Sequence, residues 1–201
     1  MYEFESRMPT LSSIATIRSG ATLRGRDATR PDPQGSYRLV RIGDVSDHGV
    51  IEQADFPRIT PNESISAEQI LRHGDILFPG RGTRTTAATY RLDLDNAIVG
   101  AQFFVIRTKK EALPEYVAWY LRSEPSRQYF EQRRKGTYVQ LIQRVDVAEL
   151  EIPLPPMNVQ HAIAEMAKIQ HQDTTLVKQI ADLKEQLLQY RLLHTAEKSS
   201  H

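Results

Sequence analysis

The sequence predicts an α+β fold, in which a mixed α/β domain is followed by a long C-terminal coiled-coil helix. Short β-branched segments alternate irregularly with helical ones through residues 1–152, which is typical of this class. Three prolines stand between residues 153 and 156, where they exclude both a helix and a central strand. From Asn158 onward neither Pro nor Gly interrupts the chain, and Asn158 itself is suited to an N-cap.

These patterns divide the chain into four segments. Residues 1–152 form the domain, and residues 153–157 a stiff proline hinge. Residues 158–196 form a coiled-coil dimerisation helix, and residues 197–201 a disordered tail.

Apolar spacing and turn residues predict the elements of the domain. A short helix or turn is expected at residues 11–17, helices at 67–71, 115–122 and 125–134, and strands at 37–42, 49–51, 75–78, 97–99, 102–107 and 150–152. Two polar segments, 24–35 and 81–86, are expected to be loops. The aromatic side chains expected in the core are Phe78, Phe103, Phe104, Tyr116, Trp119 and Tyr120.

The C-terminal helix has an apolar seam at alternating steps of three and four residues. All its positions except Asp173 and His194 are apolar or aromatic: Val159, Ala162, Met166, Ile169, Asp173, Leu176, Ile180, Leu183, Leu187, Tyr190 and His194. A seam sustained for about five heptads is typical of a coiled coil. We therefore expect another helix to cover it, with Met166, Ile169, Leu176, Ile180, Leu183, Leu187 and Tyr190 as dimer contacts; the alternative is a helix folded back on its own domain.

Composition bounds the function. The chain has no Cys, which excludes disulfides and thiolate metal sites and favours a cytoplasmic protein. No apolar run approaches the length of a membrane span. The net charge is +1, but residues 1–157 carry 18 Arg against 3 Lys. Arginine suits phosphates and guanine edges, although a GC-rich genome raises Arg content as well.

Motifs for catalysis are absent from the sequence. It has no Gly-rich cofactor loop, no Walker loop and no tetrapeptide typical of base methylation. Asp32 with Asp182 and Lys184 superficially resembles a nuclease pattern, but the last two lie on the predicted helix. The six His residues lack metal-ligand spacing. We therefore expect no enzyme activity, no cofactor and no metal.

The order of several motifs resembles the DNA-specificity (S) subunit of type I restriction–modification systems. It begins with Leu-Ser-Ser-Ile-Ala at residues 11–15 and continues with Tyr-Arg-Leu-Val-Arg-Ile-Gly-Asp-Val at 37–45. Gly-Asp-Ile-Leu at 74–77, Tyr-Val-Ala-Trp-Tyr-Leu at 116–121 and Ile-Pro-Leu-Pro-Pro at 152–156 follow. Full-length subunits of that family have two target recognition domains and two long helices, so this chain resembles a half-length form.

The resemblance implies a non-catalytic, sequence-specific DNA-binding subunit. Its domain is expected to read half of a bipartite site in the major groove of double-stranded DNA. Its helix is expected to form a homodimer and to tether the type I methyltransferase and restriction subunits. Two-fold symmetry would make the half-sites identical and inverted.

Three polar segments are the candidate DNA-reading loops. Their Gly residues allow close approach to phosphates, and their Arg, Thr and Gln side chains match phosphates and base edges. The candidate residues are Arg24, Arg26, Arg81, Thr83, Arg84, Thr85, Arg133, Lys135, Tyr138 and Gln140. The alternatives are solvated turns and, for residues 133–140, a charged helix end.

Two other functions stay open from the sequence. The first is a protein-only adaptor that modulates a larger restriction–methylation complex without touching DNA. The second is the recognition fragment of a fused restriction–methylation enzyme. Salt-dependent binding of duplex DNA distinguishes the first of these from the DNA-binding subunit.

Overall fold

The computed structural model describes residues 8–25, 29–46, 48–51, 55–82, 86–134, 136 and 140–198, with backbone alone for the last three. The chain divides into two units, residues 1–162 and 163–201. All strands and short helices belong to the first, globular unit, and helix α5 (Met157–Lys198) begins in it and supplies the second. The predicted α+β class with a long C-terminal helix is confirmed.

A four-stranded antiparallel sheet is the centre of the globular unit. Its strand order is β1 (Ala15–Ser19), β7 (Phe103–Thr108), β4 (Ile76–Pro79) and β5 (Ala88–Thr89). Every residue of β4 is buried, which explains its uninterrupted apolar sequence. Helix α3 (Glu124–Arg133) covers this strand, since the rings of Phe78 and Phe130 lie 4.9 Å apart between centroids.

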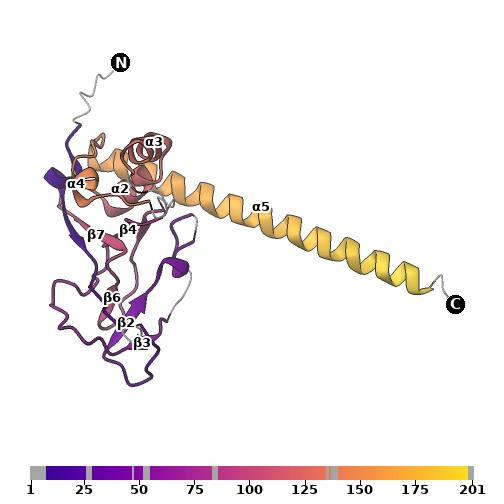
Figure 1. Cartoon of the computed structure of the whole chain (residues 1–201). Helices are drawn as coiled ribbons and strands as arrows, with labels where there is room; N and C mark the ends of the chain where they lie inside the picture. Colours follow the sequence, from indigo (N-terminus) through magenta and orange to yellow (C-terminus); the bar gives the residue numbers. More distant parts are fainter. Residues whose placement is uncertain are drawn as a thin grey trace, which may run out of the picture. The chain divides into compact units, whose positions relative to one another are not determined.

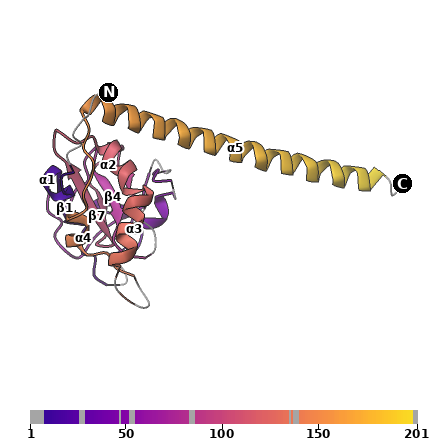
Figure 2. The same cartoon turned by 90° about the horizontal axis from the view of Figure 1, so that it is seen from above.

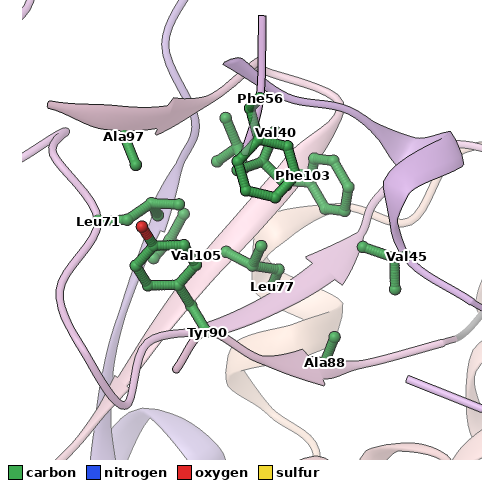
Figure 3. Close-up of a cluster of buried hydrophobic side chains, with 11 residues drawn as sticks. Val40, Val45, Phe56, Leu71, Leu77, Ala88, Tyr90, Ala97, Phe103 and Val105 are labelled. Atoms are coloured by element: carbon green, nitrogen blue, oxygen red, sulfur yellow. The ribbon is translucent and has the colours of Figure 1, made fainter. Parts of the chain in front are cut away.

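A second sheet of three strands has the order β3 (Arg58–Ile59), β2 (Tyr37–Val40) and β6 (Ala97–Val99). Strands β2 and β6 are parallel, and β3 is antiparallel to β2. Figure 1 places this sheet at the end of the globular unit away from α2 (Pro114–Leu121), α3 and α4 (Arg144–Ala148). The main core lies between the sheets, where Val40 from β2 meets Leu77, Phe103 and Val105 from the larger sheet (Figure 3).

The remaining short elements flank the larger sheet. Helix α1 (Leu11–Ile14) leads directly into β1, and Figure 2 shows α1, β1 and α4 together on the side of the globular unit opposite α3. A 3-10 helix, η1 (Ile42–Asp44), follows β2. An ion pair also joins β7 to the residue before β4, because buried Asp75 receives two hydrogen bonds of 2.7 Å from Arg107.

Most predicted elements of the globular unit are present within one or two residues. The strands expected at 75–78, 97–99 and 102–107 are β4, β6 and β7, and the helices expected at 115–122 and 125–134 are α2 and α3. The strand expected at 37–42 ends at Val40 because the chain turns into η1. Strands β3 and β5 and helix α4 have two to five residues each and were not predicted.

Four expectations were wrong. The short helix or turn expected at 11–17 ends at Ile14, because the β-branched residues that follow pair with β7. Residues 67–71 form a turn, with the Gln69 amide donating to the Ser66 carbonyl at 2.9 Å. The strands expected at 49–51 and 150–152 are single bridges, Val45 to Ile51 and Thr10 to Glu151.

The junction into α5 also differs from the prediction. Asn158 lies inside the helix, which begins at Met157, and the Pro156 carbonyl accepts from the amides of Val159 and Gln160 at 2.9 and 3.1 Å. A carbonyl preceding Asn158 therefore opens the helix, and no Asn158 cap is formed. The phenol of Tyr116 donates to the Pro153 carbonyl, which fixes the start of the proline segment.

Gln160 fixes the other end of the proline segment. Its side chain is only 1% exposed and makes three hydrogen bonds. It accepts from the Leu113 amide at 2.8 Å and donates to the carbonyls of Glu111 and Pro155 at 3.0 and 2.9 Å. The first turn of α5 and the prolines therefore pack as part of the globular unit.

The aromatic residues expected in the core divide into two groups. Phe78, Phe103, Phe104 and Tyr116 are buried. Trp119 and Tyr120 are only partly buried, because their positions on α2 turn away from the sheet.

Candidate nucleic-acid interface

A groove of about 580 Å³ lies at the ends of several strands of the globular unit. Its described lining comes from residues 21–23, 29, 39, 41–43, 81 and 100–102. The lining includes Arg41, Arg81 and Gln102, and none of the described lining residues is Asp or Glu. The groove therefore presents donors and positive charge without a competing carboxylate in its walls.

Gly20 allows one wall of the groove to form. The Ala21 amide donates to the Val99 carbonyl at 2.7 Å, and Ala21 forms a parallel bridge with Gly100. A Cβ at Gly20 would lie 2.2 Å from the Gly100 carbonyl oxygen, which real contacts do not allow. The loop that begins at Ala21 is thereby held against the turn that carries Gln102.

Gly80 allows Arg81 to line the groove. The chain leaves β4 across the ring of Phe104, where a Cβ on Gly80 would lie 2.6 Å from a ring carbon. The Gly80 amide donates to the Gln102 carbonyl at 2.8 Å. The main-chain hydrogen bond of Gly80, the residue before Arg81, therefore keeps Arg81 and Gln102 close together.

The loop after β4 is joined to the loop after α3. Arg81 forms an antiparallel bridge with Leu141, and the Gly82 amide donates to the Gln140 carbonyl at 2.9 Å. One nitrogen of Arg134 donates to the Gly82 carbonyl at 2.9 Å and to the Gln140 side chain at 3.1 Å. Burial lowers the pKa of the Arg134 guanidinium. Two segments separated by about fifty residues therefore form one surface.

The structure brings the three predicted loops close together, but the predicted residues in these loops do not all lie at the groove. Arg81 lines the groove, Gln140 lies beside it, and Arg24 follows the lining residue Leu23, with its amide bonded to Glu63 at 3.1 Å. Arg133 is engaged elsewhere, because its guanidinium lies 3.7 Å from the ring centroid of Tyr129. The predicted residues that lie outside the described part of the chain are Arg26, Thr83, Arg84, Thr85, Lys135 and Tyr138.

Three polar residues of this surface were missing from the predicted set. Arg41 and Gln102 fell within expected strands, where alternation assigned them to a sheet face. Arg41 also donates to the Thr29 carbonyl at 2.9 Å, so part of its guanidinium holds the groove wall. Arg134 stood in a basic run whose structural role depends on contacts with residues 82 and 140.

The predicted dimer contacts of α5 are exposed. The seam side chains from Met166 to Tyr190 that were expected to meet a partner are between 49% and 70% exposed. An apolar row of this length in water is characteristic of a helix that associates with another helix.

The described residues contain no helix long and apolar enough to cross a membrane. Within the same described ranges, no three His, Cys, Asp or Glu side chains are grouped in a way that suits a metal ion.

Comparison with known proteins identifies the family. A profile of the type I restriction modification DNA specificity domain matches residues 5–186. The chain belongs to this family. The resemblance found from the motifs is thereby confirmed, and no curated protein matches the chain significantly.

Solved structures share the fold. An HsdS subunit from Thermoanaerobacter tengcongensis superposes with a TM-score of 0.61 at 18% identity, over 86% of this chain and 39% of that one. A chain from a study of assembly and conformational transition of the type I R-M system gives 0.62 at 19%, over 85% and 39%. The S subunit from M. genitalium gives 0.55 at 19%, over 86% and 40%. The present chain thus spans about two fifths of their length.

Proposed function

We propose that the chain is a non-catalytic DNA-specificity subunit of a type I restriction–modification system. Its globular unit reads half of a bipartite site in the major groove of double-stranded DNA. Helix α5 forms a homodimer and tethers methyltransferase and restriction subunits, which carry out the reactions.

The observation that carries this proposal is one groove lined by two of the candidate loops, with the third loop attached to the second. Loops that begin at residues 21 and 80 supply part of the lining, and the loop that begins at residue 134 is joined to the one at residue 80 by a main-chain bridge and by Arg134. The groove contains two arginines and no carboxylate among its described lining residues. Such a local basic surface suits a polyanion even though the whole chain has a net charge of only +1.

Each polar group of the groove has a role that follows from its chemistry. Arg81 is exposed and suited to a bidentate contact with guanine O6 and N7, and the Gln102 amide matches adenine N6 and N7. Arg24 is exposed at the rim, where a phosphate contact is the expected role. Gln140 and Arg134 hold the loops in place, and Arg26, Thr83, Arg84, Thr85, Lys135 and Tyr138 stay predicted contacts.

The exposed seam of α5 supports the proposed dimer. A second apolar stripe runs beside that seam through Val177, Ala181 and Leu188, which are also exposed. One helix partner covers a single seam, so the second stripe favours a further helix from another subunit. We assign this stripe to the methyltransferase.

DNA binding is tested with duplexes selected from a random pool by the purified protein. We expect enrichment of one motif, with affinity that falls steeply between 50 and 200 mM salt because phosphate contacts release counterions. A protein-only adaptor would enrich nothing and would bind no duplex at either salt concentration. Methyl transfer by the chain alone would identify the fragment of a fused enzyme instead.

The dimer is tested by sedimentation of a variant carrying Ile180→Asp and Leu187→Asp. Two carboxylates in the seam should yield monomers, because each would be desolvated against apolar side chains. The control carries Thr175→Asp and Gln189→Asp, which add the same charge to the outer face of the same helix. Intact dimers in the first variant, or monomers in both, would contradict a dimer built on this seam.

A further inference from the structure

We propose that Leu141 reads the 5-methyl group of a thymine in the base pair next to the guanine bound by Arg81. This inference rests on the proposed DNA-binding function and adds a specificity-determining residue that is not among the described lining of the groove. The ligand is a single apolar group at the edge of a base pair, so its recognition differs in kind from the polar contacts proposed above.

Leu141 is an apolar side chain on the surface of the globular unit, where it is 40% exposed. The exposed large hydrophobic side chains among the described residues of that unit are Met8, Val50, Leu141 and Val145. A single exposed leucine is common on protein surfaces and indicates no function by itself. Leu141 differs from the other three because, among the described residues, it alone forms a bridge with a residue that lines the groove.

The bridge between Leu141 and Arg81 brings their side chains to the same side of the main chain. Main-chain hydrogen bonds flank this pair on both sides, from Gly82 to Gln140 at 2.9 Å and from Ile142 to Gly80 at 3.0 Å. In antiparallel pairing this pattern identifies a non-hydrogen-bonded pair, in which the Cα atoms are about 4.5 Å apart and the side chains approach most closely. The leucine and the arginine therefore leave the main chain together.

Burial of the next residue directs this pair outward. Ile142 is only 4% exposed, and successive side chains of an extended chain point to opposite faces. Leu141 therefore points to the solvent together with Arg81, which is also exposed. Arg134 joins the two segments through the hydrogen bonds described above, so the pair is held in place before DNA binds.

The thymine methyl is the apolar group that base pairs present in the major groove. When Arg81 contacts guanine O6 and N7, Leu141 lies about one base step away, since a separation of about 4.5 Å is close to the step of about 3.4 Å in B-DNA. Arginine is longer than leucine, but the methyl projects from the base edge, and an apolar contact of about 4 Å exceeds a hydrogen bond of about 2.9 Å. The two side chains therefore reach neighbouring base pairs at once.

This contact discriminates against the other bases as well as favouring thymine. Cytosine presents its N4 amino donor at the same edge, and the purines present the N7 acceptor. Leu141 satisfies neither group, so burying one of them against its side chain is unfavourable. The leucine thus adds specificity without adding charge, and its contribution does not depend on the release of counterions.

The test replaces each thymine of the duplex selected from the random pool by deoxyuridine, which lacks only the 5-methyl group. We expect about fourfold weaker binding at one position, equivalent to about 0.8 kcal/mol for one buried methyl group. The guanine read by Arg81 is located with 7-deazaguanine, which should weaken binding by the parent protein but not by Arg81→Ala. The proposal is overturned if no thymine is sensitive, or if the sensitive one is not in the base pair next to that guanine.

Variants at position 141 assign the methyl contact to this side chain. Leu141→Ala should bind the thymine and uracil duplexes equally, whereas Leu141→Met should keep the preference for thymine. Both should show the salt dependence of the parent, because neither removes a charge. Val145→Ala, which shortens an exposed apolar side chain on α4, is the control and should keep the preference. A preference retained in Leu141→Ala, or lost in Val145→Ala, would contradict a direct contact.

The outcomes separate this inference from the proposed function. A pool without an enriched motif, together with no binding of duplex DNA, would refute DNA reading altogether. An enriched motif without any effect of the thymine methyl would refute the role of Leu141 alone. A Leu141→Ala protein that keeps its thymine preference but loses binding to a methyltransferase would assign the side chain to a protein partner instead.

Discussion

Replacing Arg81 by Ala tests the proposed DNA-reading groove most specifically. Arg81 lines the groove and is exposed, and its side chain makes no hydrogen bond or ion pair with the described residues. Its removal should therefore leave the free energy of unfolding within about 0.5 kcal/mol of the parent. A lost bidentate contact with guanine costs about 1–3 kcal/mol, which corresponds to a roughly 5- to 150-fold weaker affinity for the selected duplex.

The assay is a titration of the selected duplex at two salt concentrations, together with a duplex of scrambled sequence. Affinity for the scrambled duplex should fall much less, since Arg81→Ala removes a base contact as well as one charge. Arg127→Ala is the control, because Arg127 pairs with Glu124 on the surface of α3 and removes the same charge. Equal losses in both variants, or an unchanged preference for the selected duplex, would refute a base-reading role for Arg81.

Three further variants test the framework of the globular unit. Gln160→Leu should lower the free energy of unfolding by about 2–3 kcal/mol, since three main-chain groups lose their partner. Gln189→Leu on the exposed helix should change it by less than about 0.5 kcal/mol. Equal effects of the two substitutions in denaturant titrations would contradict a stabilising role for the Gln160 hydrogen bonds. Burial raises the pKa of Tyr116 to about 12, above its unfolded value near 10, so the stability it contributes is complete below pH 10 and is lost as the pH rises to 12. Tyr116→Phe should flatten the loss of stability between pH 10 and 12, and an unchanged slope would show that other groups cause it. Gly20→Ala should destabilise the protein by about 1–3 kcal/mol, because main-chain oxygens of Val99 and Gly100 occupy the space that its Cβ would need. Gly43→Ala has open space around its Cβ and should leave stability unchanged. Comparable melting temperatures of the two variants would contradict the tight packing of Gly20 against residues 99 and 100.

Elements with many apolar residues in one pattern could be predicted from the sequence. Strand β4 is buried along its whole length, and α2 begins at Pro114, so both carry strong local signals. The prediction of one short helix or turn at 11–17 failed because apolar residues at Leu11, Ile14 and Ile17, each three residues apart, also fit a helical turn followed by a strand. Pairing with β7, which lies about ninety residues later, decides between them.

The residue types of the candidate site could be predicted from the sequence, but the particular residues that line the groove could not. Glycine and arginine identified the loops, because those residue types serve close approach and anion contact wherever the loop lies. The sequence gives no sign that Gln102 would share a groove with Arg81, since a main-chain bond from Gly80 brings them together. Likewise, Arg133 and Arg134 are neighbours in a basic run, and the sequence does not distinguish their roles. In the structure Arg133 stacks on the Tyr129 ring, whereas Arg134 donates to the Gly82 carbonyl and joins two loops.

Mapping methylated bases in the genome of cells that carry this chain and the methyltransferase proposed to bind it tests the central claim most directly. If one globular unit reads each half-site and two copies pair through α5, every methylated site must contain two identical half-sites in inverted orientation, separated by a constant spacer. Two different half-sites, or a spacer of variable length, would contradict a symmetric dimer of this chain.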